Sequence, residues 1–377
     1  MSDHLKYYKK IKIAPTLDLK DLNHKILISQ RKKFYFSLGL TKNSFENKKI
    51  LELCCGTGYN MHFLKSQFKC GKSLVVDHNP NSIKLAKKNL SKYKDITVLD
   101  KDIRKFKCKK KFDYVLIENS LDNINNPQKI VDKIINLTKK DGNIIMTVGD
   151  NYGIFSEKLR FVYSIILLDQ RPKKKISEKV YFLSNIFKYH LNTLTKNLRK
   201  PDKWVLDNIL NENWIKKKNY FGVTQLIKKI KGKLIIQNVY PSFMEKKKFY
   251  KKINFQNINK KYLNTHINNQ LNLLDANTQF DKFCNIETNI KNIYAVINKL
   301  SIDKKLDKKL ILKIKIELEN MRKKILKRCN KNNVTLMIEE FNNIIDDFMN
   351  DKKVTTKTKH LSKFWSVYNQ HILLHKI

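Results

Sequence analysis

The stretch from Lys49 to Asn60, KILELCCGTGYN, decides the fold of this 377-residue chain. Its first half is a short apolar run interrupted by one acid, Glu52, and its second half contains Gly56 and Gly58. A buried strand that enters a glycine-containing turn and continues as an amphipathic segment is typical of the first unit of an open α/β sheet. Glycine at these positions lets the backbone turn tightly and approach a ligand without an intervening side chain.

Further apolar runs follow this stretch and alternate with amphipathic segments. The strand candidates are 73–77, 96–99, 112–117 and 143–148, with a later one at 233–240. The turn Lys140-Asp141-Gly142 carries the glycine that commonly ends a helix. Strands that alternate with helices in this way predict a doubly wound, mostly parallel α/β sheet.

Glycine and proline occur only in the first part of the chain. Neither residue occurs after Pro241, and apolar stripes among charges over 303–328 and 334–349 predict helices. The expected organisation is a helical lead-in at 1–47, an α/β domain at 48–240 with an aromatic-rich helical insertion at about 153–222, and an all-α domain at 250–377.

The chain is strongly basic, with 78 Lys and Arg against 34 Asp and Glu and a formal net charge of +44. Only seven of these basic residues are Arg, the side chain that binds phosphates bidentately. The excess is also spread evenly, since residues 251–377 hold 25 basic and 12 acidic residues. We interpret the charge mainly as background composition, and RNA is the less favoured partner.

Neither a membrane span nor export is indicated by the sequence. The longest apolar run, 161–168, is far shorter than the roughly 20 residues that cross a bilayer. The first residues, MSDHLK, contain no apolar signal core. Six cysteines without a CxxC pair argue against a disulfide framework or a metal site, so we expect a cytoplasmic protein.

Two common nucleotide-binding motifs do not fit the glycine loop. A dinucleotide fingerprint needs glycine where the chain has Met61. Gly71-Lys72-Ser73 looks like the end of a P-loop, but Ser66 replaces the required glycine and the triplet precedes a strand.

In five places the chain resembles the class I S-adenosylmethionine-dependent methyltransferases, which have a Rossmann-like fold. The matched segments are the loop 52–58, the strand end 75–79, residues 102–103, the strand 112–119 and the helix–glycine–strand segment 137–145. They cover about residues 48–150 in the order of the family. Cys54 replaces the first glycine of the family's loop, as in several members.

The resemblance implies S-adenosylmethionine as the cofactor. It places Asp77 at the ribose hydroxyls, Asp102 at the adenine amino group and the end of the strand at Glu118 beside the methionine part and the acceptor. An ionised carboxylate suits a diol because it only accepts hydrogen bonds, and acids also suit a sulfonium cation. The candidate cofactor-binding residues are Glu52, Cys54, Gly56, Gly58, Asn60, Asp77, His78, Asp102, Ile103, Glu118 and Asn119.

The sequence excludes several methyl acceptors. Residues 118–121 read ENSL and lack the Pro-Pro motif of the adenine-N6 and cytosine-N4 enzymes. No cysteine follows a proline, which excludes the cytosine-C5 class, and the cysteine spacing excludes radical methylases. We expect O- or N-methylation of a small-molecule or saccharide-type acceptor. RNA methylation and a non-catalytic scaffold with a helical interaction module remain alternatives.

Two of the four candidate residues on the acceptor side lie in the insertion, and the other two precede it. Its eight aromatic residues over 181–221 are interpreted mainly as packing. The segment 204–208, WVLDN, resembles one in uncharacterised bacterial methyltransferases. The candidate catalytic residues are His190, Asp207, Asp122 and Tyr152.

Overall fold

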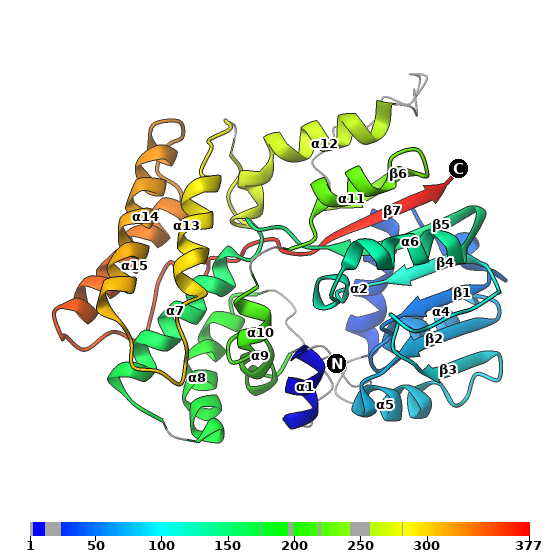
Figure 1. Ribbon diagram of the computed structural model, residues 1–377, viewed down its shortest axis with the longest axis horizontal. Helices are drawn as coiled ribbons and strands as arrows, with labels where there is room; N and C mark the ends of the chain where they lie inside the picture. Colours follow the sequence, from blue (N-terminus) through cyan, green and yellow to red (C-terminus); the bar gives the residue numbers. More distant parts are fainter. Residues whose placement is uncertain are drawn as a thin grey trace. The chain divides into compact units, whose positions relative to one another are not determined.

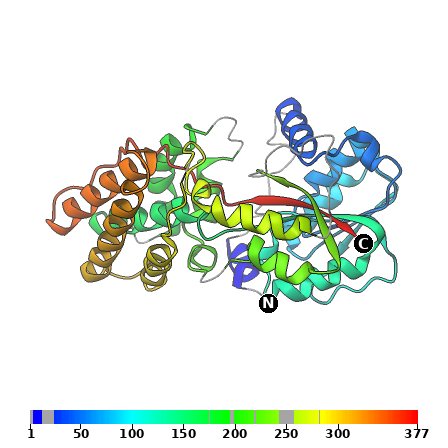
Figure 2. The ribbon, with the colours of Figure 1, turned by 90° about the horizontal axis from the view of Figure 1, so that it is seen from above.

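The computed structural model describes residues 3–11, 24–173, 175–194, 199–217, 220–241, 257–280 and 282–377. These residues form two compact units. Unit 1 contains Met1–Gly149, Phe221–Ile267 and Asn369–Ile377, and unit 2 contains Asp150–Tyr220 and Asn268–Tyr368. The colours in Figures 1 and 2 show that both units combine segments that are far apart in the sequence.

Unit 1 is built on a seven-stranded sheet with the order β3-β2-β1-β4-β5-β7-β6. The first five strands in the chain are parallel to one another, and β7 is antiparallel to both of its neighbours. The strands are β1 (Ile50–Leu53), β2 (Ser73–Asp77), β3 (Ile96–Asp100), β4 (Phe112–Ile117), β5 (Thr138–Val148), β6 (Leu234–Tyr240) and β7 (Gln370–Lys376). The predicted mostly parallel α/β sheet is confirmed.

Helices cover both faces of this sheet because alternate strand residues point to opposite sides. Leu51 and Leu53 of β1 belong to one hydrophobic cluster, whereas Ile50 belongs to the other. The first cluster includes α6 (Pro127–Leu137) and α11 (Val223–Ile230). The second includes α2 (His24–Ser37), α3 (Lys42–Phe45), α4 (Tyr59–Phe68) and α5 (Pro80–Leu90).

The last strand, β7, corrects the expectation of an all-helical region over 250–377. It pairs with β5 on one side and with the edge strand β6 on the other. The helix before it in unit 1, α12 (Ile258–Asn268), packs its buried Tyr262 into the first cluster. Ile372 and Leu374 enter one cluster, while Leu373 enters the other. A strand buried on both faces reads as a continuous apolar run, and periodicity alone does not distinguish such a run from a helix.

Unit 2 is helical and joins two regions that the sequence assigned to different domains. Its first helix, α7 (Phe155–Gln170), is buried along almost its whole length. Arg160 donates to the carbonyl oxygens of Leu361 and Phe364 at 3.0 and 2.7 Å, and the Tyr163 hydroxyl donates to Thr355 O at 2.6 Å. The expected insertion therefore shares one core with residues 268–368, which corrects the boundaries at 153–222 and 250–377.

The remaining helices of unit 2 follow α7 in the chain. They are α8 (Ile176–Leu191), α9 (Pro201–Asn208), α10 (Glu212–Ile215), η4 (Gln270–Leu273), α13 (Glu287–Ile297), α14 (Lys308–Leu326) and α15 (Asn333–Met349). Asp307 and Asn332 cap the last two helices by accepting hydrogen bonds from the N–H groups of Lys309 and Thr335. In the described ranges, no helix is both long enough and apolar enough to cross a membrane.

Removing a side chain of β7 from the core tests the contribution of this strand. Leu374 is fully buried, so we expect Leu374→Ala to lower the free energy of unfolding by about 3 kcal/mol. Ile377 follows the strand and is 55% exposed, so Ile377→Ala should change it by less than about 0.5 kcal/mol. Urea denaturation followed by circular dichroism measures both, and equal effects would contradict a buried β7.

Candidate functional site

The strand order places a topological switch point between β1 and β4, and a ligand crevice is expected at the ends of these strands. The chain leaves β1 towards β2 on one side, while β4 and β5 extend the sheet on the other side. Helical connections that diverge at such a switch point leave room for a ligand outside the carboxyl ends of the strands. The residues that follow these two strands are the loop 54–58 and the segment 118–120.

Both strand ends adopt a left-handed backbone that favours glycine. Cys54 has φ +58° and Asn119 has φ +53°. A non-glycine residue in this region is strained by about 1–2 kcal/mol, and such strain is concentrated at functional sites. The replacement of the family's glycine by Cys54 therefore keeps the loop conformation at an energetic cost.

The loop reaches α4 through Gly58, which caps that helix with φ +74°. A Cβ atom on Gly58 would lie 2.8 Å from Leu90 Cδ1 of α5, closer than real contacts allow. Glycine at this position therefore permits both the turn and the close packing of the loop against α5.

Asp77, at the end of β2, is fixed by the neighbouring backbone. Its Oδ2 accepts a hydrogen bond from Gly56 N at 2.8 Å, and its Oδ1 accepts from His78 N and Asn79 N at 2.7 and 2.9 Å. Burial raises the pKa of Asp77 above its ordinary value, while these three N–H groups oppose that rise. A carboxylate has about four acceptor positions, so the oriented Asp77 can still accept a hydroxyl proton.

A buried polar network connects the ends of β1 and β4. Arg31 of α2 binds Glu118 in a bidentate pair, with both N–O distances at 2.9 Å. Asn60 of α4 donates from Nδ2 to Glu52 Oε1 at 3.2 Å and to Glu118 Oε1 at 3.1 Å. Asn60 Oδ1 in turn accepts from Arg31 and from the Tyr35 hydroxyl. The amide of Asn60 thus holds both carboxylates in fixed positions.

One acceptor in this network is left open. Glu52 Oε2 is buried and has no hydrogen-bond partner among the described residues. An unpaired buried acceptor is costly, and a ligand with a positive or hydrogen-bond-donating group would satisfy it. The residues present therefore fit a cationic group such as the sulfonium or ammonium of S-adenosylmethionine.

The two carboxyl groups have opposite pKa shifts. Burial raises the pKa of Glu52 to about 8, and the negative charge of Glu118 adds to this effect. Burial also acts to raise the pKa of Glu118, but the charge of Arg31 and its hydrogen bonds lower the pKa below the ordinary value. Glu118 is therefore ionised at neutral pH, whereas Glu52 is mostly protonated until a cation binds.

Asp102, another acid expected to bind the cofactor, lies beyond β3 and is paired with the nearby Arg104. Lys101 N donates to the Asp77 carbonyl oxygen at 2.9 Å, which joins this segment to β2. Arg104 Nε lies 3.0 Å from both carboxylate oxygens of Asp102 and lowers the pKa of Asp102 to about 2. Ile103 beside it is buried, and His78 Nε2 is buried without a hydrogen-bond partner among the described residues.

The four acceptor-side candidates are divided between the two units. Asp122 belongs to unit 1, where its Oδ1 accepts from Phe221 N at 2.7 Å and anchors the chain before α11. Asp207 belongs to unit 2, where it forms an ion pair with Arg199 at 2.5 Å. Both carboxylates therefore have structural partners.

The expectation that His190 is an acceptor-side base is wrong. Its ring is fully buried in unit 2 and contacts Arg160 Nε at 3.3 Å and Thr358 Oγ1 at 3.1 Å. Burial, together with the charge of Arg160, lowers the pKa of His190 to about 2. Tyr152 is also buried in unit 2, and burial raises the pKa of its phenol well above the ordinary range. Neither side chain is suited to accept a proton from a substrate.

The sequence did not single out Arg31 and Tyr35. They lie one helical turn apart on α2, so both face the network from a segment expected only as a lead-in. The i, i+4 spacing is a usable signal, but it does not identify Glu118, 87 residues away, as the partner.

A pair of glycine substitutions tests the loop geometry. Gly58 and Gly232 have nearly equal positive φ values, but only Gly58 has neighbours within 4 Å of an added Cβ. We expect Gly232→Ala to lower the free energy of unfolding by about 1 kcal/mol, and Gly58→Ala to lower it further and to weaken S-adenosylmethionine binding. Urea denaturation and titration calorimetry measure the two effects, and equal cofactor affinity in both variants would contradict a role of the loop.

Comparison with known proteins gives one family match. Residues 44–179 match the model of a methyltransferase domain. No curated protein matches the sequence.

Solved methyltransferase structures match part of this chain. The N-methyltransferase NodS from Bradyrhizobium japonicum WM9, in complex with S-adenosyl-L-homocysteine, is 18% identical, and the match covers 38% of this chain and 74% of NodS with a TM-score of 0.32. An S-adenosylmethionine-dependent methyltransferase from Clostridium acetobutylicum ATCC 824 is 21% identical, with 40% and 57% coverage and a TM-score of 0.29.

These TM-scores are low, so the assignment depends on the family model and on the motifs along the sheet. The matched family model covers β1 to β5, including the ends of β1 and β4. The chain therefore carries a methyltransferase domain over residues 44–179, with a mostly parallel, Rossmann-like sheet.

Proposed function

We propose that the protein transfers the methyl group of S-adenosylmethionine to an oxygen or nitrogen of a small-molecule or saccharide-type acceptor in the cytoplasm. The observation that carries the proposal is the open, buried oxygen of Glu52 at the switch point of the sheet. It provides a site for a cation in a chain with a net charge of +44.

In this proposal, the residues of the crevice bind separate parts of the cofactor. Asp77 holds the ribose hydroxyls. The backbone of the loop with Cys54, Gly56 and Gly58 passes close to the cofactor. Glu52, together with Asn60, binds the cationic part. The segment after β4, Glu118 and Asn119, borders the methionine part. The adenine lies beside His78, Asp102 and Ile103.

When bound, the cofactor supplies an electrophilic methyl group on a sulfonium, so transfer needs an oriented nucleophile and little covalent chemistry from the protein. The chain contributes orientation and a dry environment. Asn60 fixes the Glu52 carboxyl group, and Arg31 neutralises Glu118 so that Glu52 is free for the ligand. Arg31 is therefore a positioning residue.

The arginine side chains support a small acceptor over RNA. Four of the seven, Arg31, Arg104, Arg199 and Arg322, are paired with carboxylates within their own unit. A fifth, Arg160, is fully buried. Because bidentate recognition of phosphates depends mainly on Arg, few such groups remain for an RNA backbone.

The pKa of Glu52 gives a pH signature for cofactor binding. A bound cation stabilises the carboxylate, so binding releases a proton wherever free Glu52 is protonated, below about pH 8. We expect affinity to rise with pH by up to about tenfold per unit below pH 8 and to level off above it. The Glu52→Gln variant should bind more weakly and lose this dependence. Titration calorimetry in buffers of different ionisation enthalpy measures the released proton, and pH-independent affinity in the native chain would contradict the assignment.

Methyl transfer from labelled S-adenosylmethionine tests the reaction itself. We expect saturable labelling in the low-molecular-weight fraction of an extract, and we expect Asp77→Ala to weaken cofactor binding by about 100-fold through loss of charge-assisted hydrogen bonds. Asp132→Ala is the matched control, because Asp132 is a surface acid of α6 paired with Lys229. Label only in RNA would favour the RNA alternative, and absence of cofactor binding would favour the scaffold alternative.

A further inference from the structure

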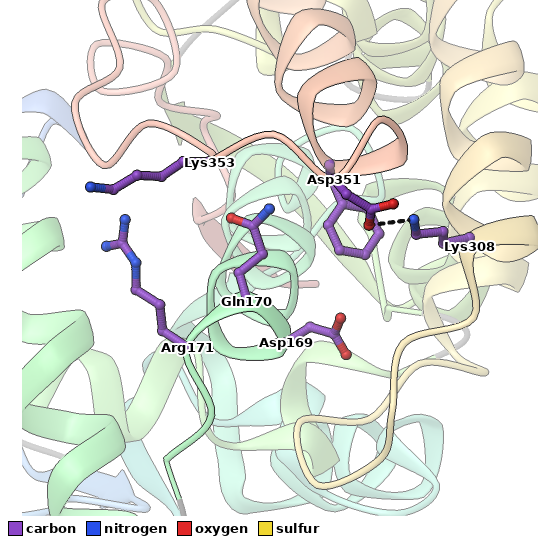
Figure 3. A pocket seen from close by; sticks show the side chains of 7 residues that line it. Asp169, Gln170, Arg171, Lys308, Asp351 and Lys353 are labelled. Carbon is purple, nitrogen blue, oxygen red and sulfur yellow. Dashed lines mark hydrogen bonds and ion pairs between the residues drawn. The ribbon is translucent and has the colours of Figure 1, made fainter.

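Unit 2 contains an open pocket of about 520 Å³ whose lining is mostly charged (Figure 3). It lies between the end of α7, the start of α14 and the chain that follows α15. The lining residues are Asp169, Gln170, Arg171, Lys308, Phe348, Asp351 and Lys353.

The acids of this pocket have partners on one side of it. Asp351 forms an ion pair with Lys308 at 2.7 Å, and Lys308 Nζ also donates to Met349 O at 3.3 Å. Asp169 Oδ1 accepts a hydrogen bond from Leu306 N at 3.0 Å, just before α14. These contacts turn both carboxylates towards the beginning of α14.

The opposite side of the pocket carries two cations, and Gln170 fixes the backbone beside one of them. Its Nε2 donates to Lys352 O at 2.6 Å, and its Oε1 accepts from Val354 N at 3.0 Å. These hydrogen bonds flank Lys353 on both sides and fix its backbone beside the end of α7, where Arg171 follows Gln170. In Figure 3 the side chains of Arg171 and Lys353 extend to the same side of the pocket, away from the Lys308–Asp351 pair.

Among the described residues, no hydrogen-bond acceptor or carboxylate contacts either of these two charged groups. The Arg171 guanidinium has a ring contact with Phe182, at 5.9 Å from the centroid, and Lys353 is an exposed residue. Two like charges at one side of a pocket repel each other, and a bound anion removes this repulsion.

We propose that this pocket binds a small molecule that carries a phosphate group. The phosphate lies between Arg171 and Lys353, where the planar guanidinium and the ammonium donate to its oxygens. The volume is in the range of small-molecule sites and exceeds the need of a single phosphate ion. Phe348 also lines the pocket and gives the organic part of the ligand an apolar contact.

Calorimetric titration of the full chain at 150 mM salt tests the proposal, with glucose 6-phosphate, glucose and inorganic phosphate as probes. We expect glucose 6-phosphate to bind, inorganic phosphate to bind more weakly and glucose not to bind. Arg171→Gln and Lys353→Gln should each weaken glucose 6-phosphate binding by about tenfold, and the double variant by about 100-fold.

The matched control is the double variant Lys327→Gln and Arg328→Gln. It removes the same two charges from exposed positions at the far end of α14, roughly 27 Å from Lys308 along the helix. Unchanged binding in the control with loss in the pocket variant supports the site. Equal losses in both would show a general effect of the basic surface and overturn it, as would absence of binding by both phosphate probes. Equal affinity for the two phosphate probes would support an anion site but overturn the role of the organic part.

Discussion

The site depends on the balance of charge around two carboxyl groups at the ends of neighbouring strands. Glu52 is buried, the side chain of Glu118 is 11% exposed, and the Arg31 guanidinium compensates only Glu118. Removing one partner of a buried ion pair typically lowers the free energy of unfolding by about 3–5 kcal/mol, because the remaining charge stays buried without compensation. Helix α2 is therefore part of the crevice as much as the strands are, since it brings the cation without which Glu118 would compete with Glu52 for protons and ligands.

The basic composition and the acidic crevice act on different length scales. Charges of surface lysines are screened by salt within about 8 Å, whereas buried carboxyl groups act on a ligand at contact distance and with little screening. A chain with a net charge of +44 can therefore still bind a cation, provided that the carboxyl groups lie inside and the lysines outside. Glu52 at the end of β1 satisfies this condition.

Much of the sheet could be predicted from the sequence because its signals are local. Apolar runs, the turn at Gly56 and Gly58, and the strand-end acids each lie within a few residues of the feature they indicate. β7 escaped prediction because its apolar run has no glycine or proline beside it and its partners lie in β5 and β6. Arg31 escaped for a similar reason, since its partner is 87 residues away. His190 was misjudged because the sequence does not show that Arg160 and Thr358 enclose its ring.

The position of β7 between β5 and β6 has a consequence for biosynthesis. Thr147 of β5 and His371 of β7 contact each other across 224 residues of chain. At about 5–20 residues per second, a ribosome needs roughly 10–45 s to make the intervening segment. During this interval the β5 edge of the nascent sheet has no β7 to pair with, and unpaired edges promote association with other chains. A chaperone that binds the nascent chain until β7 has been synthesised would protect the edge of β5.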